Sequence, residues 1–293
     1  MNDPFALDKR RLRRAFEKAA PGYDSAAALQ REVCARMLER LSLVRISPHT
    51  ILDAGSGTGN AVSGLARRYP QARVIELDIS QPMLRVARKR APWWRRLLPG
   101  VGSTQVCGDI ERLPLCPASI DLLWSNLALQ WSTDLQRSLA ENLRVLKAGG
   151  LLMFSTFGPD TLRELRLSFA RVDHGVHVNH FVDMHDVGDM LVRGGFSDPV
   201  MDSEIFTLTY RQPEELMREL KALGAHNATL GRSRGLSGRK MFAHMAGEYE
   251  RFRLTDGRLP ATFEVVYGHA WKPEPRPGPG DRAVIDIKVA PGV

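Results

Sequence analysis

The chain has 293 residues, of which 43% are hydrophobic and 25% are charged, and its formal net charge is +8. This composition is typical of a globular protein, and no apolar run approaches the roughly 20 residues that a membrane-spanning helix needs. The first residues lack the apolar core of a secretion signal, and Cys34, Cys107 and Cys116 lack the spacing of metal ligands. We therefore expect a cytoplasmic protein with reduced thiols, without a metal and without membrane attachment.

Two helices are expected before the first strand. Apolar residues recur at helical spacing over residues 8–20, and Pro21-Gly22 ends that helix. Residues 30–43 are expected to form a second helix, which leads into the first strand. The first helix does not follow a strand, and it is a candidate for part of a cap over the strand ends.

A glycine-rich turn follows the first strand. Residues 51–59 read Ile-Leu-Asp-Ala-Gly-Ser-Gly-Thr-Gly, and a helix is expected after them over residues 60–69. In open α/β sheets this arrangement holds a nucleotide, because glycines let backbone N–H groups approach the ligand and the helix start favours negative groups. The alternative is a tight turn that uses its glycines for geometry alone. The candidate ligand-binding residues of the turn are Asp53, Gly55, Gly57 and Gly59.

The next three predicted strands also end in polar residues. They cover residues 73–78, 104–109 and 120–126 and end in Asp78, Asp109 and Asn126. Asp78 lies 19 residues beyond Gly59, close to the roughly 20-residue spacing at which an acid meets the ribose hydroxyls of a nucleotide. A helix cap could explain any one of these acids, but four polar strand ends together favour a ligand site at the carboxyl edge of the sheet.

The second half of the chain departs from a regular alternation of strand and helix. A helix over residues 135–146 and a strand over residues 151–155 continue the pattern. Further helices are expected at residues 160–169, 183–193, 213–223 and 239–253, with strands at 205–210 and 262–271. The simplest architecture is an α/β sheet whose extra helices cap the strand ends, although these helices could also only thicken the core.

Positive charge is concentrated in two segments. Lys9–Arg14 opens the chain, and Arg85–Arg96 carries six positive charges and no acid. Such clusters attract polyanions. No nucleic-acid motif accompanies them, so nucleic acid is an unlikely partner, whereas an acidic protein fits and a solvated face is the alternative.

The glycine turn and the acids after it resemble the class I S-adenosylmethionine (SAM) methyltransferases. The resemblance implies a Rossmann-like, mostly parallel seven-stranded sheet with helices on both faces and SAM as the methyl donor. It also implies that the turn from Asp53 to Gly59 holds the methionine part and that Asp78 binds the ribose. Asp109 would accept from the adenine amino group, with the N–H of Ile110 beside it.

The need for a catalytic base limits which chemical groups can be the methyl acceptor. A carboxylate is already ionised at pH 7 and needs none, whereas a hydroxyl or carbon acceptor wants a base that works near that pH. No His or Lys occurs in the loop after the fourth strand, Leu127–Trp131. This favours an acceptor that is acidic or already nucleophilic.

Beyond the SAM core, the chain resembles the malonyl-ACP (acyl carrier protein) O-methyltransferases of biotin synthesis. The stretches that carry the resemblance are residues 16–24, 108–114, 125–131, 154–162, 177–181 and 259–262. The resemblance implies methylation of the free carboxylate of a malonyl thioester, carried on ACP or on coenzyme A. Acidic ACP would then be the partner of the two basic segments.

The same resemblance suggests roles for residues outside the SAM core. Tyr23 and Trp131 would wall the malonyl pocket, and Asn126 and Gln130 would bond the substrate or SAM. His177 and Asn179 would reach the malonyl carboxylate from the cap. Ordinary packing is the alternative for the aromatic pair, and a structural role is the alternative for His177.

The resemblance also divides the chain. Residues 1–43 are expected to contribute cap helices, 44–157 the SAM core, 158–272 further cap helices and strands of the same domain, and 273–293 a flexible tail. Two other functions stay open. The chain also resembles a mitochondrial complex I assembly factor that shares the SAM fold and modifies an arginine of a partner protein. A SAM-binding protein without catalysis is the second alternative.

Overall fold

The computed structural model describes residues 7–90, 103–173, 175–225 and 239–275. The strands are β1 Thr50–Ala54, β2 Arg73–Asp78, β3 Ser103–Cys107, β4 Ile120–Asn126, β5 Leu146–Phe157, β6 Ser197–Tyr210 and β7 Leu259–Trp271. The helices are α1 Lys9–Ala19, α2 Tyr23–Ala26, α3 Ala28–Ser42, α4 Val62–Arg68, α5 Gln81–Arg90, α6 Leu135–Val145, α7 Arg163–Ala170, α8 Met184–Arg193, α9 Pro213–Ala222 and α10 Arg239–Tyr249. Two short 3-10 helices are η2 Leu129–Trp131 and η3 Glu250–Phe252.

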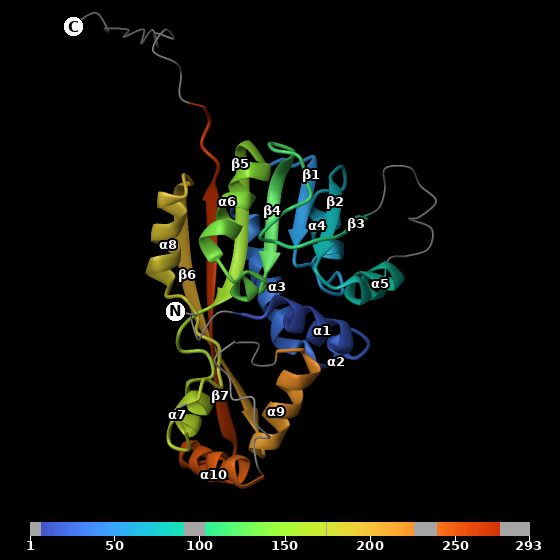
Figure 1. The fold of residues 1–293 in the computed structure, drawn as a ribbon. Helices are drawn as coiled ribbons and strands as arrows, with labels where there is room; N and C mark the ends of the chain where they lie inside the picture. The colour runs from blue at the N-terminus through green and yellow to red at the C-terminus, as the bar shows by residue number, and fades with distance from the viewer. Residues whose placement is uncertain (1–6, 91–102, 174, 226–238, 276–293) are drawn as a thin grey trace, which may run out of the picture.

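The strands form one seven-stranded sheet in the order β3-β2-β1-β4-β5-β7-β6 (Figure 1). Strands β1 to β5 pair with one another in parallel, and β7 runs antiparallel to both β5 and β6. The chain order reverses between β1 and β4, which is where open α/β sheets bind ligands at the carboxyl ends of their strands. The predicted seven-stranded, mostly parallel sheet is confirmed.

Helices cover both faces of the sheet. Neighbouring residues of each central strand point to opposite faces, and on these strands both sets of residues are apolar. Ile51, Leu122 and Leu151 join the core cluster that contains side chains of α3 and α4. Their neighbours Leu52, Leu123 and Leu152 join the cluster on the other face, with side chains of α6 and α8. These continuous apolar runs are what a strand buried on two faces requires.

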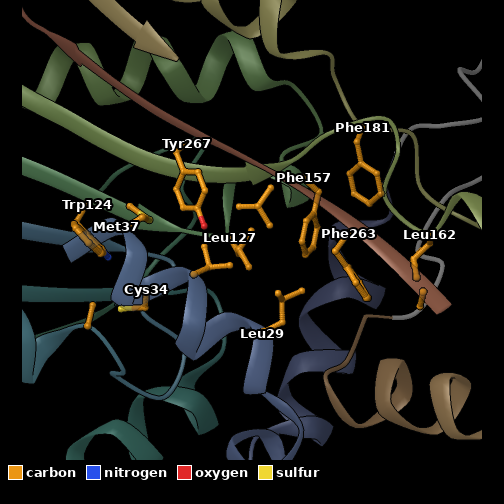
Figure 2. Close-up of a cluster of buried hydrophobic side chains, with 14 of the residues drawn as sticks. Leu29, Cys34, Met37, Trp124, Leu127, Phe157, Leu162, Phe181, Phe263 and Tyr267 are labelled. Carbon is orange, nitrogen blue, oxygen red and sulfur yellow. The ribbon is translucent and has the colours of Figure 1, made fainter. Parts of the chain in front are cut away.

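The core under α3 continues into an aromatic group beside the cap. Figure 2 shows Met37 and Trp124 at one end of this cluster and Phe157, Phe181 and Phe263 at the other. The ring of Phe157 lies 5.6 Å from that of Phe181 and 5.8 Å from that of Phe263, measured between centroids. These three side chains come from β5, the loop before α8 and β7, so the core joins the sheet to the cap.

The cap is built on the two long antiparallel strands. Strand β6 has 14 residues and β7 has 13, whereas β1 has five. Their far halves extend beyond the carboxyl ends of the parallel strands and carry α7, α9 and α10 (Figure 1). Helix α1 lies between these elements and the sheet and packs on α5 through Ala19, Ala20 and Met83.

Several boundaries differ from the predicted ones. Strand β6 begins at Ser197 and not at residue 205, because its first half is a half-exposed edge that pairs only with β7 and contains a bulge. Strand β3 ends at Cys107, so Asp109 lies beyond it in an isolated bridge with Arg112. Helices α2 and η2 were not predicted, since elements of three or four residues leave no periodic signal.

Parts of two predicted segments fall outside the described residues. These parts are residues 91–96 of the basic segment Arg85–Arg96 and residues 276–293 of the expected tail. Within the described residues, no helix is long and apolar enough to cross a membrane. The three cysteines are free thiols, with Cys34 buried and Cys107 and Cys116 exposed.

Candidate active site

Two cavities meet at the carboxyl edge of the sheet. One lies beside the glycine turn and is called the turn cavity here; its wall includes Tyr23, Gly55, Gly57, Asp78, Asp109 and Asn126, and it continues along Asp53 and Thr58. The other, the cap cavity, lies among β5, β7, α7, α9 and α10 and has a volume of about 640 Å³. Trp131 lines both cavities.

The glycine turn is held against β2 by backbone hydrogen bonds. The N–H groups of Gly55 and Ser56 donate to the carbonyl of Leu77 over 2.7 and 2.9 Å. Gly55 has a φ of +80°, and a Cβ there would lie 2.2 Å from the Cβ of Ala128. Only glycine fits this position, because the turn and the loop after β4 approach each other too closely for a side chain.

The structure gives Gly59 a role in close packing. Its φ is +77°, and a Cβ there would lie 2.8 Å from Oε2 of Glu76. It is absent from the lining of the turn cavity, whereas Gly55 and Gly57 belong to it. Gly59 is therefore required for the close approach of the turn to β2 and α5. The prediction that Gly59 also binds the ligand stays untested.

Asp78 is poised to bind hydroxyl groups. Its two carboxylate oxygens accept from the backbone N–H of Gly57 over 2.9 Å and from that of Ser80 over 2.7 Å. Burial raises the pKa of Asp78 to about 6, although these two hydrogen bonds oppose the shift. The carboxyl group lines the turn cavity and is ionised at neutral pH.

Asp53 is a buried acid in the wall of the turn cavity. The residue is only 2% exposed, and within the described residues its Oδ2 is buried without a hydrogen-bond partner. Burial raises the pKa of Asp53 well above its usual value, and the nearby carboxylates of Glu76 and Asp78 raise it further. A buried acid without a partner is unfavourable, so this site favours an ammonium group in the cavity.

Arg31 supplies a positive charge to the same part of the turn cavity. It lies on α3, lines the cavity together with Asp53 and the glycine turn, and donates to the carbonyl of Asp24. The cavity thus has an acid on one wall and a guanidinium on another, as a zwitterionic amino acid requires. Arg31 could not be predicted as a site residue, because helical spacing alone does not show which face of α3 meets the turn.

Asp109 and Ile110 lie at the other end of the turn cavity, beside Lys9. Nζ of Lys9 donates to Oδ1 of Asp109 over 2.6 Å and lies 2.9 Å from Oε1 of Glu111. Nζ of Lys9 therefore points into the protein, whereas the arginines of the basic segment Lys9–Arg14 are exposed. Its contact ties the start of α1 to the loop after β3.

Asn126 and Gln130 hold the loop after β4. The Asn126 amide lines the turn cavity, donates to the carbonyl of Gln30 over 3.1 Å and accepts from Ser155 over 3.0 Å. Nε2 of Gln130 donates to the carbonyl of Leu127 over 2.7 Å, and Gln130 is absent from the lining of both cavities. The structure thus gives Gln130 a role in loop geometry, and its predicted contact with a ligand is untested.

Tyr23 and Trp131 lie at the junction of α1, α2 and the loop after β4. Tyr23 lines the turn cavity, and burial and the charge of Asp78 raise the pKa of its hydroxyl, which stays protonated. The ring of Phe16 in α1 meets Trp131 edge to face at 5.4 Å between centroids. Both side chains line the turn cavity, and of the two Trp131 also lines the cap cavity, so their predicted role as a wall of the malonyl pocket stays an untested prediction.

His177 and Asn179 both line the cap cavity. Nε2 of His177 is 2.6 Å from Oδ1 of Asp173, and its ring stacks on Phe169 of α7 with centroids 3.9 Å apart. Oδ1 of Asn179 is buried and has no hydrogen-bond partner among the described residues. His177 is therefore fixed by its neighbours, whereas Asn179 has an unused acceptor.

Residues 52–154 match the family described as Methyltransferase domain. The chain is 54% identical to the malonyl-[acyl-carrier protein] O-methyltransferase of Gallionella capsiferriformans, over 97% of this chain and 98% of that protein. It is 56% identical to the protein of the same name from Nitrosospira multiformis, over 92% and 91% of the two chains. A SAM-dependent methyltransferase of Thermotoga maritima shares the fold, with a TM-score of 0.52 at 19% identity over 89% of this chain and 99% of that one.

Proposed function

This chain belongs to the family of malonyl-[acyl-carrier protein] O-methyltransferases, and we propose that it transfers a methyl group from SAM to the free carboxylate of malonyl-ACP. One observation carries the proposal: identity above 50% extends over almost the whole chain and so includes the cap that surrounds the second cavity. These relatives do not favour an assembly factor or a SAM-binding protein without catalysis. The reaction would be an early step of biotin synthesis.

The residues of the turn cavity fit SAM. The unpartnered oxygen of Asp53 suits the ammonium group of the methionine part, and Arg31 suits its carboxylate. Asp78 would accept from the ribose hydroxyls, while Asp109 and the N–H of Ile110 would meet the adenine. The cavity thus offers an opposite charge or a hydrogen-bond partner to each polar part of the molecule.

The residues at the junction of the cavities suit a carboxylate acceptor. SAM, when bound, supplies an electrophilic methyl group on its sulfonium. Tyr23 stays protonated and cannot serve as a base, and Lys9 is held by two carboxylates. A carboxylate needs no base, so positioning can supply most of the catalysis, on the order of 7–11 kcal/mol in well-oriented cases. Trp131 and the cap would exclude water from the point of transfer.

The basic segments support a dock for an acidic carrier protein. Because α1 packs on α5, the described parts of the two segments, residues 9–14 and 85–90, belong to one surface next to the turn cavity. Its exposed cations are Arg10, Arg11, Arg13, Arg14, Arg85, Arg88, Lys89 and Arg90. Arg13 pairs with Glu17 and Arg90 with Asp24, so part of this charge is already neutralised. The surface would attract ACP and bring its acyl group near Trp131.

Intact-mass spectrometry of malonyl-ACP after incubation with the protein and SAM tests the proposal. We expect a gain of one methylene's mass on malonyl-ACP and none on acetyl-ACP, which lacks the free carboxylate. The absence of any gain, with SAM binding confirmed separately, would contradict the proposed reaction. Malonyl-coenzyme A in place of malonyl-ACP shows how far the carrier protein matters.

A further inference from the structure

The cap cavity is larger and less polar than a malonyl group requires. Its volume of about 640 Å³ falls within the range of roughly 300–1,000 Å³ typical of pockets that bury drug-sized ligands. Apolar side chains form most of its wall, among them Phe157, Leu165, Phe169, Phe181, Met217 and Phe263. A malonyl group has only three carbons and carries a carboxylate, so most of this apolar surface must face another part of the substrate.

Among the described residues, one side chain lines both the cap cavity and the turn cavity, where methyl transfer would take place. Trp131 lines both cavities, and the ring of Phe16 fixes it from the side of α1. A thioester whose acyl end lies at Trp131 would have the rest of its chain in the cap cavity. The groups next to the sulfur therefore meet the apolar wall described above.

The cavity also borders the basic surface. Lys221 and Ala225 at the end of α9 line it, and Lys221 is exposed. Between them Gly224 lies so close to α1 that a Cβ would be 3.1 Å from the carbonyl oxygen of Ala15. A chain that leaves the cavity along this end of α9 thus emerges beside α1, where an acidic carrier would dock.

One polar group in the wall indicates the chemistry of the substrate part that binds in the cap cavity. Oδ1 of Asn179 is buried and unpartnered among the described residues, so it favours an N–H donor in the cavity. A malonyl carboxylate and a thioester carbonyl offer only acceptors to that oxygen. The pantetheine arm of a carrier, in contrast, combines secondary amide N–H groups with an apolar chain and geminal methyl groups.

We propose that the cap cavity binds the pantetheine arm of the thioester substrate and that Oδ1 of Asn179 accepts a hydrogen bond from an amide of the arm. This inference rests on the proposed function, and it assigns Asn179 to the arm and not to the malonyl carboxylate. The exposed ammonium of Lys221 lies where the phosphate at the end of the arm would leave the cavity. His177 holds the wall through Asp173 and Phe169 and is a positioning residue.

The test compares malonyl-pantetheine with the S-methyl thioester of malonate, which has the same acyl group and no arm. For the unaltered protein we expect kcat/KM to be at least tenfold higher with malonyl-pantetheine. Asn179→Ala should lower kcat/KM for malonyl-pantetheine about tenfold and leave that for the methyl thioester unchanged. Equal values for both thioesters, or an equal loss on both in the variant, would overturn the proposal.

A second variant fills the cavity without disturbing the core. Ala243 lines the cavity from α10 and is exposed, so Ala243→Trp should fold normally. We expect it to reduce turnover of malonyl-pantetheine and to spare the methyl thioester. An unaltered thermal midpoint of both variants in the presence of S-adenosylhomocysteine would show that SAM binding and folding are intact.

Binding of free pantetheine, measured by calorimetry with S-adenosylhomocysteine present, separates this inference from the proposed reaction. Saturable binding that Asn179→Ala weakens supports the arm site even if malonyl-ACP is never methylated. Methylation of malonyl-ACP without any binding of pantetheine, and without a difference between the two thioesters, supports the reaction and refutes the arm site.

Discussion

The two cavities that meet at Trp131 differ in how many polar groups they carry. The turn cavity sets several polar groups among apolar neighbours, and its acids Asp53 and Asp78 are at least nine-tenths buried. Among the described residues, the wall of the cap cavity comes from six helices and strands and from the loops before α7 and α8, and most of its side chains are apolar. Binding in the first should therefore depend mainly on its polar groups, whereas binding in the second should depend on apolar shape together with a polar contact at Asn179.

The largest effect is expected at Asp78. Asp78→Ala removes the carboxylate that would accept from the ribose and that already receives N–H groups from Gly57 and Ser80. A lost hydrogen bond to a charged group is worth roughly 1.5–3 kcal/mol, so affinity for SAM should fall by about ten- to more than a hundredfold. Calorimetric titration with S-adenosylhomocysteine measures this fall.

The matched control is Asp202→Ala, which removes an acid from the exposed edge strand β6. It should bind the ligand as well as the unaltered protein does. Equal affinity for all three proteins would refute the ribose assignment. A tenfold loss of S-adenosylhomocysteine affinity in Asn179→Ala would show that the two cavities do not bind their ligands independently.

The second prediction concerns pH. Because burial raises the pKa of Asp78 to about 6, the ligand-free protein gains stability from protonated Asp78 at low pH and loses that gain as pH rises through about 6. Binding of SAM requires the ionised form of Asp78. Its affinity should therefore decline about tenfold per pH unit below pH 6, with uptake of a proton when the ligand leaves.

Thermal midpoints with and without S-adenosylhomocysteine, measured from about pH 5 to 7.5, follow this linkage. The stabilisation by ligand should grow with pH in the unaltered protein and be much flatter in Asp78→Asn. A ligand effect that is constant across this range would show that Asp78 does not titrate there. Binding of pantetheine to the cap cavity should not share this pH dependence.

A smaller effect is expected from the basic surface. Arg85 and Lys89 are exposed on α5, and reversing both charges with Arg85→Glu and Lys89→Glu should raise the KM for malonyl-ACP roughly fivefold. The KM for malonyl-pantetheine should not change, and the difference should shrink at high salt. Steady-state kinetics with both substrates measures it.

Reversal of Arg137 and Arg193, on α6 and α8, alters the net charge by the same amount at a different place. This control should leave both KM values unchanged. An equal rise for the two substrates in the α5 variant would show that the charges act on the catalytic site itself. An equal rise in both variants would show that only net charge matters.

The turn cavity could be predicted from the sequence because its signals are local. Asp53, the glycines and Asp78 follow one another along two strands, and their spacing alone places them at one sheet edge. The same reasoning failed to find Lys9 and Arg31, which reach the cavity from helices whose packing the spacing does not reveal. It also could not separate Gly59, which serves close packing, from the glycines that line the cavity.

The cap cavity is harder to predict for a related reason. Phe157, Phe181 and Phe263 meet around it although β7 lies about a hundred residues beyond β5 in the chain. Apolar periodicity identifies their strands and helices but not which buried side chains surround an empty volume. The matching cap stretches of the family pointed to His177 and Asn179. Only the structure shows that the His177 ring is fixed and that Oδ1 of Asn179 has no partner in the described part of the chain.

The smallest effect is expected at Arg31, which tests a single polar contact within the turn cavity. Arg31 is exposed, and exposed ion pairs contribute roughly 0.2–1 kcal/mol, so Arg31→Ala should weaken S-adenosylhomocysteine binding by no more than about fivefold. Methylthioadenosine lacks the amino acid part, and its affinity should not change. Arg36→Ala is the matched control, since Arg36 lies on the same helix and pairs with Glu32. Equal losses for the two ligands would place Arg31 away from the carboxylate, because only a contact with the amino acid part can distinguish them.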